Sequence, residues 1–189
     1  MLSALDDPHH QQFTDAELAA IVDEARRMDR AVAAHCHGKA GIMAALRAGV
    51  HTIEHGSWLD EEAAEAMVAA GAMLVPICFV SRHLRDLGDG GGVPDHTVTK
   101  IAAAGDHHDE GVQVALAAGV PIAMGTDTLA SYLWGRNAQE AVLLAGLGMA
   151  PDAVITAATA NGPLTLGPAS SALRPARRRA RRRRHHTRR

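Results

Sequence analysis

Two histidines and one aspartate stand at the ends of short apolar segments, where they could hold a metal ion or move a proton. His35 ends a segment that begins at Ala31, His55 ends one that begins at Val50, and Asp127 ends the segment 120–127. Each segment has the apolar character of a β-strand and is followed by a turn. Two imidazoles and a carboxylate that converge would form a partial site for a divalent cation.

These three residues belong to a regular alternation of strand-like and helical segments. The apolar periodicity predicts strands at about 31–35, 50–55, 72–77 and 120–125, and helices at about 16–28, 38–48, 60–70, 97–118, 137–147 and 151–160. Alternation with short glycine-containing turns predicts parallel strands and right-handed crossovers. The carboxyl ends of such strands open onto one face, so we expect His35, His55 and Asp127 to meet there.

Four strands are fewer than the eight that close a barrel, so the predicted fold is α/β, a partial (β/α)8 barrel of about four βα units. Residues 80–96 interrupt the alternation and include five residues, 88–92, of which four are glycine. Because this stretch follows a strand end, we expect it to form an active-site loop.

Other polar residues near these strand ends admit more than one interpretation. His37 lies one pleat beyond His35 and could contact substrate or support the loop. Glu54 precedes His55 and should point to the opposite face of the strand. His107 and His108 are expected to be exposed on a helix. His35 and His55 could also be ordinary core histidines, although two of them at adjacent strand ends favour a metal site.

Charge divides the chain into two segments. Residues 1–167 contain all 21 acidic residues and nine of the 19 basic ones, which gives a net charge of −12, whereas residues 168–189 contain ten arginines and no acid. The first segment is expected to form the domain and the second a disordered tail. An abrupt change to low-complexity arginine is also what a shifted reading frame in GC-rich DNA would produce.

Composition favours a cytoplasmic protein outside the membrane. The apolar fraction is 47%, but no apolar run is long enough to span a bilayer, and the first residues lack the pattern of a signal peptide. Cys36 and Cys78 have no metal-binding or disulfide spacing and are expected to be small buried side chains.

Three motifs, in this order and spacing, resemble the ends of the fifth, sixth and eighth strands of the amidohydrolase superfamily, in its imidazolonepropionase-like and Xaa-Pro dipeptidase-like branch. They are Ala34-His35-Cys36-His37-Gly38, Thr52-Ile53-Glu54-His55-Gly56 and Gly125-Thr126-Asp127-Thr128. The resemblance covers roughly residues 1–160 and implies the C-terminal half of the barrel. It implies that His35, His55 and Asp127 bind a divalent metal, most simply zinc, and that Asp127 takes a proton from the attacking water.

The resemblance also implies a function and its alternatives. Members of this family hydrolyse amide, cyclic amide or ester-like bonds of small molecules. The family's His-x-His pair and carboxylated strand-end lysine are not present, since no His-x-His precedes residue 35 and the only lysines, Lys39 and Lys100, fall in predicted helices. We therefore expect a metal-dependent hydrolase that is truncated and impaired. The alternatives are an inactive fragment with residual metal binding and an arginine-tail protein that binds nucleic acid or an acidic surface. Exposed barrel edges would also permit oligomers.

Overall fold

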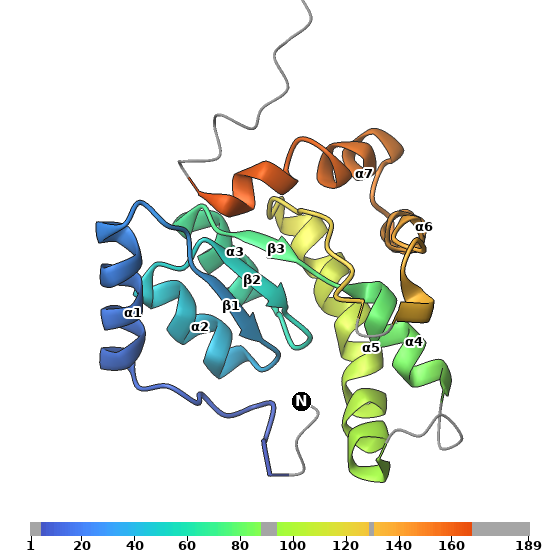
Figure 1. The fold of residues 1–189 in the computed structure, drawn as a ribbon, viewed down its shortest axis with the longest axis horizontal. Coiled ribbons are helices and arrows are strands. Elements are labelled where there is room, and N and C mark those ends of the chain that lie inside the picture. Colours follow the sequence, from blue (N-terminus) through green and yellow to red (C-terminus); the bar gives the residue numbers. More distant parts are fainter. Residues whose placement is uncertain (1–4, 88–93, 129–130, 168–189) are drawn as a thin grey trace, which may run out of the picture.

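The computed structural model of the chain describes residues 5–87, 94–128 and 131–167. At its centre lies a sheet of three short strands, β1 (Ala33–Cys36), β2 (Thr52–His55) and β3 (Met73–Val75). The strands are parallel and lie in the order β1-β2-β3. Their arrowheads therefore point the same way in Figure 1, and their carboxyl ends lie at one edge of the sheet. The expected parallel α/β arrangement is confirmed.

The fourth predicted strand, 120–125, forms a single bridge instead of a regular strand. Ile122 bridges to Leu74 in β3, where the Leu74 N–H donates to the Pro121 carbonyl (2.9 Å) and the Ala123 N–H donates to the Leu74 carbonyl (2.9 Å). The next N–H, of Met124, donates to the Ala157 carbonyl in a helix (3.1 Å). Pairing with β3 therefore stops after one residue, although the segment still lies beside β3.

Most helices begin and end within two residues of their predicted bounds. They are α1 (Asp15–Arg27), α2 (Lys39–Ala48), α3 (Glu61–Ala70), α5 (Asp95–Ala118), α6 (Ala138–Gly146) and α7 (Pro151–Ala158). Short 3₁₀ turns occur at Ser131–Leu133 and Gly162–Leu166. Local signals set these bounds: Thr14 forms a capping box with Glu17 before α1, and Asp60 accepts from the Ala63 N–H at the start of α3.

One helix was not predicted. Residues 78–87 form α4 (Cys78–Leu87), so the expectation of a loop over 80–96 is wrong for its first part, and the run 88–93 lies outside the described residues. The N-terminus of α4 is capped from a distance, because the carboxylate of Glu140 in α6 accepts from the backbone N–H groups of Cys78 (2.9 Å) and Phe79 (2.6 Å). A contact over about sixty residues leaves no local signal in the sequence.

The core is aliphatic, as the aromatic content of 3% requires. Ile42, Ile53, Met67, Leu74 and Leu144 have no exposed surface and belong to one cluster that joins the sheet to the surrounding helices. Figure 1 shows α1 and α2 beside β1, with α4, α5 and α6 at the opposite side of the molecule. Within the described residues, no helix has both the length and the hydrophobicity needed to cross a membrane.

Candidate metal centre

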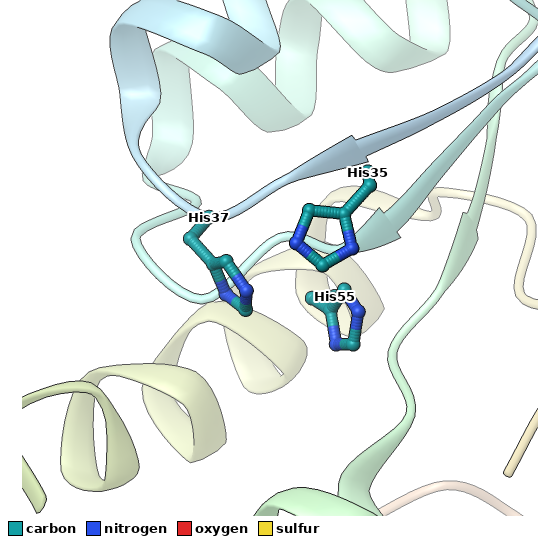
Figure 2. Close-up of side chains that lie close together, drawn as sticks. All are labelled: His35, His37 and His55. Atoms are coloured by element: carbon teal, nitrogen blue, oxygen red, sulfur yellow. The ribbon is translucent and has the colours of Figure 1, made fainter. Parts of the chain in front are cut away.

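Three histidines meet at the carboxyl ends of β1 and β2. His35 lies in β1, His37 directly follows that strand, and His55 ends β2. The ring centroids are 4.8 Å apart for His35 and His37, 4.5 Å for His35 and His55, and 4.6 Å for His37 and His55. Each ring offers one nitrogen that lies within 4.8 Å of the corresponding nitrogens of the other two. Figure 2 shows the three imidazoles grouped where the strands end.

The backbone of His55 brings its ring into this group. Parallel pairing places His55 opposite Cys36 and Glu54 opposite His35, so strict alternation would put His55 on the face away from His35. His55 instead has a φ of 71°, in the left-handed region that non-glycine residues rarely adopt. Strained backbone of this kind is concentrated at functional sites. Asp127, with a φ of 44°, shares the feature.

Burial favours the neutral form of His37 and His55, whereas His35 is exposed. Desolvation lowers the pKa of His37 to about 2 and that of His55 to about 3, and the neighbouring histidines add to both shifts. Desolvation also lowers the pKa of His35, while the negative charge of Asp127 opposes the shift. A neutral imidazole has a lone pair for a metal ion, which a protonated one lacks.

The donor set fits a zinc-like ion. Three nitrogen ligands with room for a further group are typical of catalytic zinc sites. His55 Nδ1 is buried and has no hydrogen-bond partner among the described residues, an arrangement that a cation would satisfy.

Asp127 lies in the wall of the same cavity as the three histidines. It is not part of the group whose ligand atoms lie within 4.8 Å of one another. The structure thus brings His35 and His55 together with His37 and places Asp127 nearby. Glu54 does not line this cavity, and its Oε1 accepts a hydrogen bond from the Thr52 hydroxyl (2.6 Å).

Two further buried polar residues line the cavity, and sequence reasoning missed both. His108 was expected to be exposed, but only 3% of its surface is accessible, so that prediction is wrong. The signal was present, since the buried residues of α5 recur at helical spacing and include His108 but not His107. Those residues are Thr97, Ile101, Ala104, His108, Gly111, Val112 and Ala115. Ser57, which is 2% exposed, contacts His108 and had no sequence signal.

Several known proteins resemble this chain in sequence. Residues 1–172 match the model of the amidohydrolase family. The chain is 42% identical to ochratoxinase from Aspergillus niger over 171 residues, which are 89% of this chain and 34% of that protein. It is 30% identical over 149 residues to an uncharacterized protein of Mycobacterium tuberculosis, covering 77% of this chain and 40% of that protein.

Two solved structures superpose on most of this chain. The crystal structure of A. niger ochratoxinase superposes with a TM-score of 0.79 at 41% identity, over 89% of this chain and 38% of the other. A Xaa-Pro dipeptidase with methionine bound in its active site superposes with a TM-score of 0.79 at 31% identity, over 87% of this chain and 41% of the other. The chain therefore spans between about a third and two fifths of the length of the relatives that it matches.

Proposed function

Because the chain belongs to the amidohydrolase family, we propose that it carries part of the active site of a metal-dependent hydrolase that cleaves the C–N bond of an amide, cyclic amide or dipeptide-like small molecule. The observation that carries the proposal is the group of three neutral histidines whose nitrogens lie within 4.8 Å of one another at the strand ends. Relatives named ochratoxinase and Xaa-Pro dipeptidase are hydrolytic enzymes and support the reaction class.

His35 and His55 are the first two ligands of the proposed divalent cation, for which zinc is the best fit to nitrogen donors. Two residues compete for the third position. Proximity to the other histidines favours His37, whereas the sequence pattern favours Asp127. An Asp127 that is not a ligand remains close enough to act on water in the same cavity.

A bound divalent cation would supply a more acidic water and a polarised carbonyl. The carboxylate of Asp127 accepts a proton from the attacking water and returns it to the leaving nitrogen. The apolar side chains of Val80, Leu84 and Ile101 line the cavity and limit the access of other water molecules. No residue is assigned to substrate selection.

Turnover by this chain alone is proposed to be slow. The sequence holds no His-x-His before residue 35, and Lys39, in α2, has its ammonium group bound to Asp60 and Glu62 at 2.6 Å each. These observations favour the second candidate function, a protein that binds metal without turnover. Metal-dependent turnover at about 1 s⁻¹ or more, in the ordinary enzyme range, would exclude that candidate. We also propose that the strand segments of this chain correspond to strands five to eight of the barrel. Exposed barrel edges would allow copies of the chain to associate. A cytoplasmic location is likewise a proposal.

Titration of the metal-free chain with zinc tests the site. We expect one binding site whose affinity falls at least about tenfold in His35→Ala and in His55→Ala, since each removes a nitrogen ligand. A parallel loss in His37→Ala but not Asp127→Asn would make His37 the third ligand, and the reverse result would select Asp127. His107→Ala, at an exposed position of α5, serves as the matched control. Unchanged affinity in both His35→Ala and His55→Ala would remove the assignment.

A further inference from the structure

The cavity that holds the candidate metal centre has two chemically different walls. The strand ends and the loops after them supply its imidazoles and its carboxylate, whereas α4 and α5, which lie side by side in Figure 1, supply a mostly apolar surface. The apolar side chains of that surface are Val80, Leu84, Ile101 and Ala104. A substrate bound at the metal centre would therefore place part of itself against hydrocarbon.

This apolar wall is held in place by contacts within the fold. Val80 and Ile101 are buried, and the partly buried Leu84 packs against a hydrophobic cluster that includes Val80. An ion pair between Arg82 in α4 and Asp109 in α5 (2.5 Å) joins the two helices that carry the wall. The apolar surface thus exists before any ligand binds, so a ligand does not have to order it.

The space in front of this wall is small. The cavity has a volume of about 90 Å³, whereas an apolar cavity that holds benzene measures about 150 Å³. Side chains of α4 also lie directly on α5, since a Cβ on Gly105, in the cavity wall, would lie 2.8 Å from Arg85 Nη1 and 3.1 Å from Arg85 Cδ. The cavity can therefore take a short branched aliphatic group but is too small for an aromatic ring.

The wall also favours an uncharged group. The hydroxyl of Ser81, the polar side chain that α4 adds to the cavity, donates to the Ile77 carbonyl (3.1 Å). A charged group placed against Val80 and Leu84 would lose its hydration without gaining an ionic partner from these side chains. The leaving nitrogen has to remain within reach of Asp127, so the group on the other side of the scissile carbonyl is the one that can turn toward α4 and α5.

We propose that Val80, Leu84 and Ile101 are specificity-determining residues, which accept a compact, uncharged aliphatic group bonded to the scissile carbonyl and disfavour an aromatic group there. The substrate class is then the amides of short aliphatic acids, of which 3-methylbutanoic acid is an example. The proposal rests on the metal site of the proposed function and adds to it the acyl side of the substrate.

Binding of three carboxylic acids to the zinc-loaded full chain, measured by calorimetry, tests the proposal without requiring turnover. Acetate, 3-methylbutanoate and phenylacetate share the carboxylate that would bind the metal ion and differ in the group attached to it. We expect 3-methylbutanoate to bind at least about tenfold more tightly than acetate, because each buried methylene raises affinity about fourfold. Phenylacetate should bind more weakly than 3-methylbutanoate, because its ring exceeds the space in the cavity.

Two opposite substitutions of Leu84 assign this preference to the apolar wall. Leu84→Ala enlarges the cavity, so phenylacetate should then bind at least as tightly as 3-methylbutanoate. Leu84→Trp fills the cavity and should bring 3-methylbutanoate to within about threefold of acetate. Acetate itself should bind both variants like the parent, which shows that the metal site is intact. Val142→Ala, at an exposed position of α6, is the control and should keep the order of the parent.

The outcomes separate this proposal from the proposed function. Equal affinities for the three acids, no binding of any of them, or an order that neither Leu84 variant changes would overturn the substrate class while leaving the metal site intact. Zinc affinity independent of His35 and His55, or no zinc binding by the parent chain, would overturn the proposed function and this proposal together. Melting curves show whether each variant is folded, and if Leu84→Trp is not, the result for Leu84→Ala decides.

Discussion

Neutral, buried imidazoles are the feature that makes this site chemically useful, and they also make the fold sensitive to acid. Burial lowers the pKa of His37 to about 2, of His55 to about 3 and of His108 to about 4, whereas an unfolded histidine titrates near 6.5. Between those values the unfolded chain binds protons that the folded chain does not. The contribution of these residues to stability is therefore full above about pH 6.5 and is lost as the pH falls toward the folded pKa values.

The free energy of unfolding of the metal-free chain should consequently fall as the pH decreases from about 6.5 to about 4. Each buried histidine contributes a slope of at most about 1.4 kcal/mol per pH unit. His108→Asn removes one such group and should reduce the slope, even if it also changes stability at neutral pH. Urea unfolding at several pH values measures this slope. His107→Asn, an exposed neighbour in the same helix, is the control, and an equal reduction in slope for both variants would contradict the prediction.

Sequence reasoning could find His35 and His55 because adjacent parallel strands place their carboxyl ends together whatever the details of the loops. It left the role of His37 open, because this residue lies beyond the end of β1 and its ring position depends on the turn that follows the strand. His108 was within reach, because its spacing from Ile101, Ala104 and Val112 puts it on the buried face of α5. Ser57 becomes visible only when two elements 51 residues apart meet.

At the scale of elements, Glu140 joins α6 to the start of α4. Its side chain has no exposed surface, and its two carboxylate oxygens accept from the Cys78 and Phe79 N–H groups. Burial raises the pKa of Glu140, while these two hydrogen bonds act in the opposite direction. Since α4 supplies Val80, Ser81 and Leu84 to the cavity wall, this carboxylate fixes one side of the candidate site.

Glu140→Ala should lower the free energy of unfolding by about 2–3 kcal/mol, because it leaves two buried N–H donors without their charged acceptor. Glu140→Gln retains an acceptor oxygen and should cost less. Chemical denaturation measures both. Glu24→Ala, at an exposed position of α1, should change stability by no more than about 0.5 kcal/mol. A Glu140→Ala variant as stable as Glu24→Ala would show that α4 does not depend on this cap.

Helix α5 approaches the loop after β2 closely only because residue 111 is glycine. A Cβ there would meet two carbonyl oxygens at 3.1 and 3.2 Å, and backbone atoms cannot move aside as a flexible side chain can. Gly111→Ala should therefore destabilise the fold by about 1–3 kcal/mol, despite the better helix propensity of alanine. Gly146→Ala in α6, with nothing within 4 Å of the added Cβ, should stabilise by up to about 1 kcal/mol. Thermal melting compares the pair, and a stabilised Gly111→Ala would contradict the prediction.

Elements with local signals were predictable and those held by distant contacts were not. The capping box at Thr14 and the left-handed glycines at 49, 71 and 119 mark helix ends in the sequence itself. Helix α4 was not predicted, because the residue that caps it, Glu140, lies far away in the sequence. The glycine run near residue 90 also suggested a loop. The segment 120–125 has strand-like composition, but the contact of Met124 with Ala157 ends its pairing with β3.

At the scale of the whole molecule, charge is separated along the chain. The described residues that form the core and the candidate site lie within 5–167, and the last of them, Gly167, is buried, with a Cβ position 2.9 Å from that of Ala31. Residues 168–189 carry ten arginines and a single large apolar residue, Leu173. They lie outside the described residues, so the expectation of a disordered, dispensable tail stays a prediction.

Deleting residues 168–189 should leave the melting temperature of the chain nearly unchanged, because a segment so poor in apolar residues cannot bury enough surface to offset its ordering entropy. Deletion removes ten positive charges from beside a segment of net charge −12, so the isoelectric point should fall sharply. Zinc should also bind somewhat more tightly at low ionic strength, since the remaining chain attracts cations more strongly. That difference should vanish near 1 M salt, where charges are screened beyond about 3 Å. A large drop in melting temperature, or loss of zinc binding at high salt, would mean instead that the arginine-rich segment packs against the domain.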